Sequence, residues 1–117
     1  MSTFEDLLIW QKSMDFVTEL YKITEHFPDS EKFGLVSQIR RSAVSIPSNI
    51  AEGYGRNSKG DFNRFLNISM GSLFELQTQL IIAGNLNYLE ESKNNKLYEM
   101  SREIERMMSS FIRSLQT

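Results

Sequence analysis

Apolar residues recur every three or four positions through most of the chain, which is the spacing that places side chains on one face of a helix. Four blocks of this kind follow one another. Their apolar stripes consist of Leu7, Trp10, Met14, Val17 and Tyr21; Ile39, Ala43, Ile46 and Ile50; Phe62, Leu66, Ser69, Leu73, Leu76, Leu80 and Ala83; and Leu97, Met100, Ile104, Met107, Phe111 and Leu115. Because only short connections separate the blocks, they predict an all-α, antiparallel up-down-up-down four-helix bundle in one domain, residues 1–117.

Local signals at the block ends predict where the helices start. Pro28 closes the first block, since the residue before a proline is pushed out of the helical region. Asp29 or Ser30 can then accept hydrogen bonds from the free N–H groups of a second helix. Ser58, three residues before Asp61, has the spacing of a helix-capping pair. We therefore expect the second helix to start near residue 29 and the third near residue 58.

The second block contains a proline within its apolar stripe. Pro47 removes the N–H that would bond the carbonyl of Ala43, at a cost of about 3 kcal/mol in a straight helix. A kink at this position relieves the clash, and an alternative is two short helices broken at Ile46. Gly53 and Gly55 are expected to end the block, because glycine readily takes the left-handed conformation that terminates many helices.

The first and third blocks carry more apolar surface than one core needs. A second stripe lies about 100° around each helix from the first. These extra positions are Ile9, Phe16, Leu20, Ile23 and Phe27 in the first block and Met70, Phe74, Ile81 and Tyr88 in the third. The pattern predicts contact between subunits, with a wide core-facing arc as the alternative. The residues expected in that contact are Phe16, Leu20, Ile23, Met70, Phe74 and Ile81.

Small and polar residues mark two further stretches. Gly71 and Ser72 lie in the middle of the third helix, where small side chains allow the backbone of another helix to come close. Polar residues also follow helical spacing on the second block: Arg41, Ser45, Ser48 or Asn49, and Glu52. This polar stripe has three interpretations: solvated surface, a hydrogen-bonded strip within a subunit interface, or a nucleic-acid contact.

Composition excludes several kinds of site. The 117 residues are 40% hydrophobic and 24% charged, which suits one compact domain. Because the sequence has no cysteine and one histidine, His26, it lacks disulfides, thiolate nucleophiles, Cys-based metal centres and histidine pairs. Neither a hydrolase elbow nor a phosphate-loop ending is present. We expect no enzyme activity, no cofactor, no metal, no signal peptide and no membrane span, and therefore a cytoplasmic protein.

Positive charge is concentrated in one part of an acidic chain. The net charge is −2, yet residues 40–64 hold five basic residues against Glu52 and Asp61, which gives +3 locally. The five cations are Arg40, Arg41, Arg56, Lys59 and Arg64. This zone is a candidate for phosphate contact and is equally typical of a solvated helix surface.

Four segments resemble the four-helix-bundle family of the 23S rRNA intervening-sequence proteins. They read FEDLLIWQKS (4–13), HFPDSEKFGLVSQIRRSAVSIPSNIAEGYGR (26–56), FNRFLNISMGSLFELQTQL (62–80) and REIERMMSSFIRSL (102–115). The resemblance covers nearly the whole chain. Its most specific parts are RRSAVSIPSNIAEG and GSLFELQTQL.

The resemblance implies a bacterial, antiparallel four-helix bundle that assembles into a homopentameric ring. Some relatives are encoded within insertions in large-subunit rRNA genes, and a related branch is the accessory protein of diversity-generating retroelements, which binds nucleic acid and a reverse transcriptase. The positions that match the first motif are Arg40, Arg41, Ser45, Pro47, Asn49, Glu52 and Gly53, and those that match the second are Gly71, Ser72 and Glu75.

The function predicted on this basis is a non-enzymatic homo-oligomer that acts as an accessory or scaffold for RNA or a ribonucleoprotein. Arg56, Lys59 and Arg64 are the first choice for phosphate contact, with Arg40 or Arg41 second. The retroelement branch is strongly basic, whereas this chain is acidic. A scaffold that binds only protein is therefore the alternative.

Overall fold

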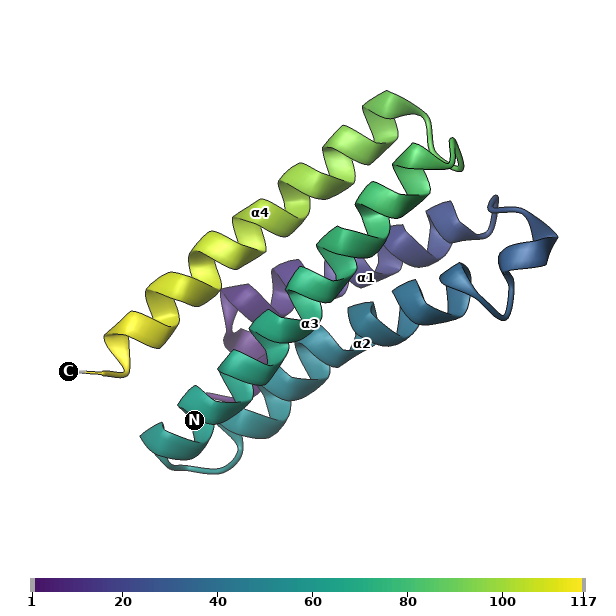
Figure 1. Ribbon diagram of the computed structural model, residues 1–117. Coiled ribbons are helices and arrows are strands. Elements are labelled where there is room, and N and C mark those ends of the chain that lie inside the picture. The colour runs from purple at the N-terminus through teal and green to yellow at the C-terminus, as the bar shows by residue number, and fades with distance from the viewer. Residues whose placement is uncertain (1, 117) are drawn as a thin grey trace.

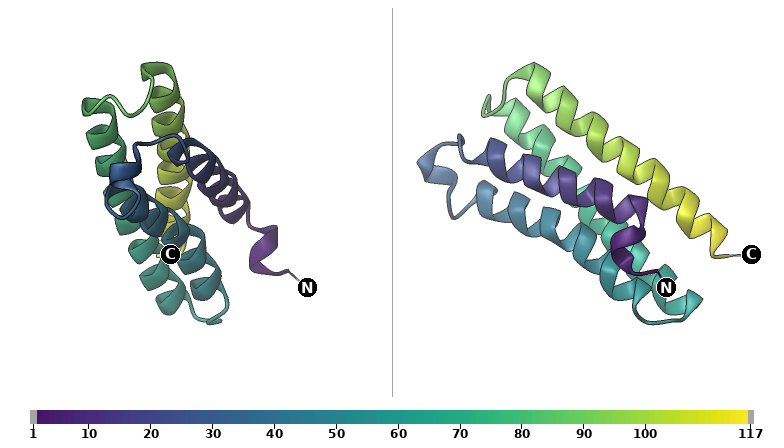
Figure 2. Two further views of the ribbon diagram at one scale, coloured as in Figure 1. Left: turned by 90° about the vertical axis from the view of Figure 1, so that its right-hand side faces the viewer. Right: turned by 180° about the vertical axis from the view of Figure 1, so that it is seen from behind.

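The computed structural model describes residues 2–116, which form an antiparallel bundle of four α-helices with dimensions of 44 × 22 × 21 Å (Figure 1). The elements are η1 (Phe4–Asp6), α1 (Leu8–Thr24), η2 (Asp29–Glu31), α2 (Leu35–Tyr54), α3 (Lys59–Asn85) and α4 (Glu91–Ser114), where η marks a 3-10 helix. One end of the bundle carries the α2–α3 turn, and the other carries the α1–α2 and α3–α4 connections (Figure 2). The predicted all-α up-down-up-down bundle is confirmed.

A single continuous cluster of apolar side chains fills the space between the helices. Its largest fully buried members are Phe16, Leu20, Ile39, Ile46, Ile50, Leu66, Leu73, Leu76, Leu80, Leu97, Ile104 and Met108. All four α-helices contribute to it. Within residues 2–116, no helix combines the length and the apolar composition needed to cross a lipid bilayer.

Two polar residues complete the buried face of α1. The Ser13 hydroxyl donates to the carbonyl of Ile9 at 2.8 Å, and the Thr24 hydroxyl donates to that of Leu20 at 2.8 Å. Such a bond to the carbonyl four residues earlier satisfies a buried hydroxyl within its own helix. The core face of α1 therefore includes polar positions, and Tyr21, from the stripe first expected in the core, lies exposed.

The second helix starts later than its sequence signals indicated. Residues Asp29–Glu31 form η2, and α2 begins only at Leu35. The predicted start at Asp29 or Ser30 is wrong because the Glu31 carboxylate itself caps α2, accepting the Leu35 N–H at 3.0 Å. The start of α3 is confirmed, since the Ser58 hydroxyl accepts a hydrogen bond from the N–H three residues later.

Helix α2 runs without interruption through its proline. Pro47 is buried inside the helix, so the alternative of two helices broken at Ile46 is wrong, and the kink stays a prediction. Gly53 lies within α2, and Gly55 follows it with a φ of −74°. The left-handed residue of the turn is Asn57, with a φ of 58°. The helix thus ends at Tyr54 with Gly55 as its C-cap, as predicted, but the expected left-handed glycine is wrong: Asn57 takes that conformation, which asparagine also tolerates.

Glu31 also joins the α1–α2 connection to the α3–α4 connection, which lies at the same end of the bundle. Its carboxylate accepts a hydrogen bond from the Tyr88 hydroxyl at 2.8 Å, and the Tyr88 ring packs against Phe27. The donated bonds from Leu35 and Tyr88 favour the ionised carboxylate, so they lower the pKa of Glu31 from its ordinary value of 4.5.

This arrangement predicts a pH-dependent contribution to stability. A carboxylate whose pKa is lower in the folded than in the unfolded chain stabilises the fold above the unfolded pKa, and this stabilisation disappears as the pH falls through the folded pKa. Glu31→Gln should therefore lower the Tm at neutral pH, and the difference from the parent chain should shrink as the pH falls below 4.5. Thermal unfolding followed by circular dichroism measures this. Glu99→Gln, at an exposed position of α4, is the matched control, and a Glu31→Gln deficit that is constant down to acid pH would contradict the assignment.

Candidate functional site

Polar side chains of α2 and α3 meet along one seam of the bundle. The Ser42 hydroxyl donates to the Glu75 carboxylate at 2.6 Å, and the hydroxyls of Ser45 and Ser72 lie 2.8 Å apart. The Asn49 amide donates to both the carbonyl and the hydroxyl of Ser45, at 2.8 and 2.9 Å. The two sequence motifs therefore meet each other within one chain. Of the polar stripe on α2, only Ser45 bonds to α3, and Asn49 bonds back to Ser45. The remaining members, Arg41, Ser48 and Glu52, are exposed.

The seam continues into a close contact between backbones. The Ser69 hydroxyl donates to the carbonyl of Ile46 at 2.9 Å. Near the end of α2, a Cβ built on Gly53 would lie 2.5 Å from the Cβ of Phe65 and 3.1 Å from the ring of Phe62. Only a residue without a side chain fits there. Gly53 is thus required for packing of the two helices.

Gly71, the glycine of the second motif, has open space around it within the chain. A Cβ on Gly71 would meet no heavy atom within 4 Å. The close helix crossing expected at Gly71 is therefore not formed by another helix of this chain, at least within the residues that the structure describes. The close crossing lies instead at Gly53, one end of the same helix pair.

The three cations preferred for phosphate contact gather around the α2–α3 turn. The guanidinium groups of Arg56 and Arg64 lie 5.1 and 4.6 Å from the ring centroid of Phe65. Arg56 also pairs with the Glu52 carboxylate at 3.2 Å. Lys59 is the exposed first residue of α3. The structure therefore brings Arg56, Lys59 and Arg64 to one end of the bundle, with the charge of Arg56 partly compensated.

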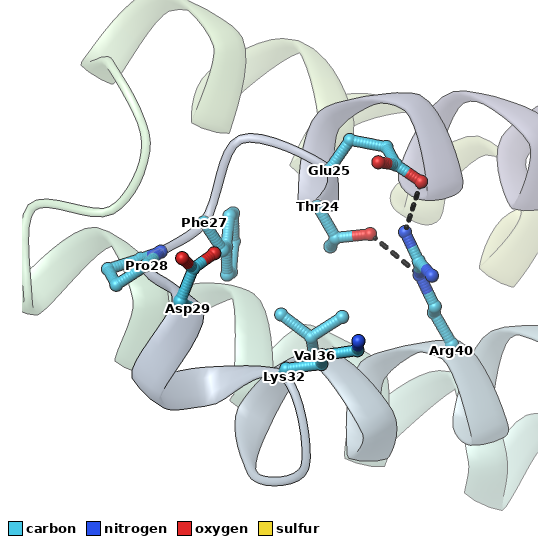
Figure 3. A pocket seen from close by; sticks show the side chains of 8 residues that line it. All are labelled: Thr24, Glu25, Phe27, Pro28, Asp29, Lys32, Val36 and Arg40. Atoms are coloured by element: carbon cyan, nitrogen blue, oxygen red, sulfur yellow. Dashed lines mark hydrogen bonds and ion pairs between the residues drawn. The ribbon is translucent and has the colours of Figure 1, made fainter.

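Arg40 and Arg41 lie away from that cluster, near the start of α2. Arg40 is directed into the protein (Figure 3): its guanidinium donates to the Thr24 hydroxyl at 3.0 Å, the Tyr21 carbonyl at 3.1 Å and the Glu25 carboxylate at 3.4 Å. These bonds fasten α2 to the C-terminal end of α1. Arg41 is exposed. The five predicted cations thus form two separate groups.

A cavity of about 350 Å³ lies beside Arg40, between the end of α1 and the start of α2 (Figure 3). Its lining combines the cations Lys32 and Arg40 with the carboxylates of Glu25 and Asp29. Opposite charges so close to one another give the cavity no clear preference for an anion or a cation. No group of three or more potential ligand side chains that could hold a metal ion occurs in residues 2–116.

Three of the predicted subunit contacts belong to the core. Phe16 and Leu20 are fully buried, and Met70 is 9% exposed and packs in the same cluster. Their assignment to an oligomer contact is wrong, because α1 turns Phe16 and Leu20 inward, α3 turns Met70 inward, and the single chain already covers all three. Ile23 is half-buried against the core.

Phe74 and Ile81 lie on the solvent side of α3, 49% and 50% exposed. Further exposed large apolar residues of α3 and its C-cap lie on the half of the helix that is turned away from the core. We call this surface the outer face of α3. Its apolar residues are Ile68, Phe74, Ile81, Ile82 and Leu86. Gly71, between the first two of them along the helix, leaves a flat spot on this face.

The sequence interpretation did not single out Phe33. Its side chain is 89% exposed in the turn that precedes α2. The available signal was its position: Phe33 belongs to none of the apolar stripes and stands directly before Gly34. A large aromatic side chain outside every core stripe indicates an exposed position.

Comparison with known proteins gives a family and a fold. A family model described as 23S rRNA-intervening sequence protein matches residues 5–110. A crystal structure at 1.70 Å of a protein with unknown function from the S23 ribosomal protein family, from Bacteroides thetaiotaomicron VPI-5482, has 25% sequence identity and a TM-score of 0.83. The similarity covers 91% of this chain and 96% of that one. No curated protein matches this chain.

The two glycines make a matched pair for testing the seam. Gly53→Ala places a methyl group against a Cβ that is fixed by its backbone, so it should destabilise the fold by about 1–3 kcal/mol. Gly71→Ala meets open space and removes a poor helix former, so it should stabilise the single chain by about 1 kcal/mol. Urea unfolding at a dilution where light scattering shows monomers measures both. Equal effects of the two substitutions would mean that the backbones are not in close contact at Gly53.

Proposed function

The chain belongs to the family of 23S rRNA-intervening sequence proteins, and we propose that it is a non-enzymatic cytoplasmic homopentamer that serves as an accessory or scaffold for RNA or a ribonucleoprotein. The fold supports the helical framework of this proposal. Its two further parts, assembly and RNA contact, are supported by different surfaces.

The outer face of α3 is the observation that carries the assembly. Its five large apolar side chains are each between 42% and 50% exposed in the single chain. Several exposed large apolar side chains on the outer half of one helix of a soluble protein are typical of an interaction surface. Gly71 adds a place where the backbone of a neighbouring helix can approach, since a Cβ there would contact nothing within the chain.

The basic cluster at the α2–α3 turn supports RNA contact. Arg56 and Arg64 flank the Phe65 ring, and Lys59 adds a third cation at the start of α3. Five copies of this cluster around a ring would bind one RNA at several points. Weak individual contacts then add up through the high effective concentration of the remaining sites.

A scaffold that binds only protein is the second candidate. It is favoured by the net charge of −2, which opposes RNA at long range, and by the Arg56–Glu52 ion pair, which partly compensates one of the three cations. The apolar outer face of α3 suffices for this function. The two candidates differ in RNA binding.

Assembly is tested by introducing charge on the outer face of α3. Light scattering of the parent chain should give about five times the 13.6 kDa of one chain. Phe74→Asp and Ile81→Asp should each lower that mass to that of a monomer without unfolding the helices, because a buried unpaired carboxylate is strongly unfavourable. Asn95→Asp, on the exposed side of α4, is the control. A parent chain that is monomeric at micromolar concentration would refute the assembly.

RNA contact is tested through its salt dependence. The triple variant Arg56→Gln, Lys59→Gln, Arg64→Gln should weaken binding to single-stranded RNA and reduce the slope of log K against log salt by about 2, since each phosphate contact on a single strand contributes about 0.7. Substitution of Lys22, Lys93 and Lys96 by Gln removes the same charge from α1 and α4 and should change the slope much less. An absence of RNA binding even at low salt would favour the protein-only scaffold.

A further inference from the structure

A groove of about 550 Å³ lies beside the turn that joins α1 to α2. Its volume is within the range of about 300–1,000 Å³ that is usual for ligand sites. The charged residues that line it are all cations: Lys32, Arg40 and Arg41. The groove is thus locally basic on a protein whose net charge is −2, and among the described residues no carboxylate lines it.

Phe33 stands at the edge of this groove on a well-fixed turn. The Lys32 N–H donates to the Asp29 carbonyl at 3.1 Å, and the Gly34 N–H donates to the Glu31 carbonyl at 3.0 Å. The turn is further held by the Glu31 carboxylate that caps α2. An exposed ring on a rigid support loses little conformational entropy when a ligand stacks on it.

The aromatic and cationic groups of the groove are paired with each other. The Arg40 guanidinium lies 4.4 Å from the ring centroid of Tyr21, and Lys32 Nζ lies 5.5 Å from that of Phe33. Glu25 compensates part of the Arg40 charge. The charges left for a ligand are therefore those of Lys32 and Arg41.

We propose that this groove binds single-stranded RNA, with a base stacked on Phe33 and backbone phosphates near Lys32 and Arg41. Exposed aromatic rings beside basic side chains are how proteins bind single strands without reading their sequence, because every base has a face to stack and every nucleotide carries a phosphate. In duplex RNA the base faces are already stacked, so the ring would gain nothing there. The proposal rests on the proposed function and adds a second contact surface to it.

The position of the groove relative to the basic cluster suits one continuous strand. Arg41 lies in the first half of α2, and the α2–α3 turn follows the last residue of that helix, Tyr54. At 1.5 Å per residue, the two are about 20 Å apart along the helix. A single strand of several nucleotides spans this distance. The outer face of α3, where large apolar side chains outnumber the one exposed carboxylate of Glu75, is a better fit for another copy of the chain, and the basic groove is a better fit for RNA.

Fluorescence anisotropy with a labelled 12-nucleotide oligouridylate tests the proposal. Phe33→Ala should weaken binding about tenfold with little change in salt dependence, whereas Phe33→Trp should retain it, because stacking needs only an aromatic face. Lys32→Gln with Arg41→Gln should lower the salt slope by about 1.4. Leu8→Ala, another exposed large apolar position, is the matched control and should leave binding unchanged.

The possible outcomes separate this proposal from the proposed function. If Phe33→Ala binds RNA as well as the parent chain while the Arg56, Lys59 and Arg64 triple variant does not, the groove is refuted and the RNA function stands. If the parent chain does not bind the oligonucleotide at low salt, both fail. Equal affinity for a duplex of the same length refutes stacking on Phe33. A lower assembly mass for Phe33→Ala in light scattering also refutes the proposal, because Phe33 then contacts another copy.

Discussion

The packing of α2 on α3 is the constraint on which the rest of the structure depends. At one end of this pair, Gly53 brings the backbone of α2 so near to Phe65 that no side chain fits between them. Along the remaining length, hydroxyl, amide and carboxylate groups join the helices, as in the Ser42–Glu75 bond of 2.6 Å. A close backbone contact fixes the separation of two helices, and directional hydrogen bonds fix their rotation and register. The two sequence motifs are therefore best explained first as the structural seam of this helix pair.

Once α2 and α3 are held in this register, the residues that each helix turns toward solvent are fixed as well. The outer face of α3 presents apolar side chains to solvent, whereas the outer side of α2 presents polar and charged residues such as Arg41 and Glu52. Rotation of either helix by one position, about 100°, would exchange these surfaces with the core. The seam thus does more than stabilise the fold: it separates a surface that suits another helix from surfaces that suit a charged ligand.

Hydrophobic periodicity predicted the four helices and the bundle, but it did not decide which face of α1 is buried. Two apolar stripes lie about 100° apart there, and the buried one includes Ser13 and Thr24. A prediction that considers only apolar residues places Ser13 and Thr24 outside the core. Each hydroxyl can nevertheless be buried, because it donates to a carbonyl of its own helix. Tertiary contacts are also needed to see that Arg40 is directed toward the end of α1. Since such contacts join residues far apart in the chain, local spacing could indicate which residues are cationic but not which ones are free to meet a ligand.

The charge distribution of the structure limits the ways in which this acidic chain could bind RNA in the proposed function. Of the five cations between residues 40 and 64, Arg40 bonds inward and Arg56 pairs with Glu52, so the local excess available to phosphates is smaller than the sequence implies. Counterion release by few cations gives a modest affinity and a shallow salt dependence. Stacking on an exposed ring does not depend on net charge. In the proposed RNA function, short-range aromatic contact would therefore contribute a larger share of the affinity for a chain with a net charge of −2 than for a strongly basic protein. Within the proposed RNA function, the exposed and rigidly held Phe33 would therefore add affinity that the partly compensated cations around it do not supply.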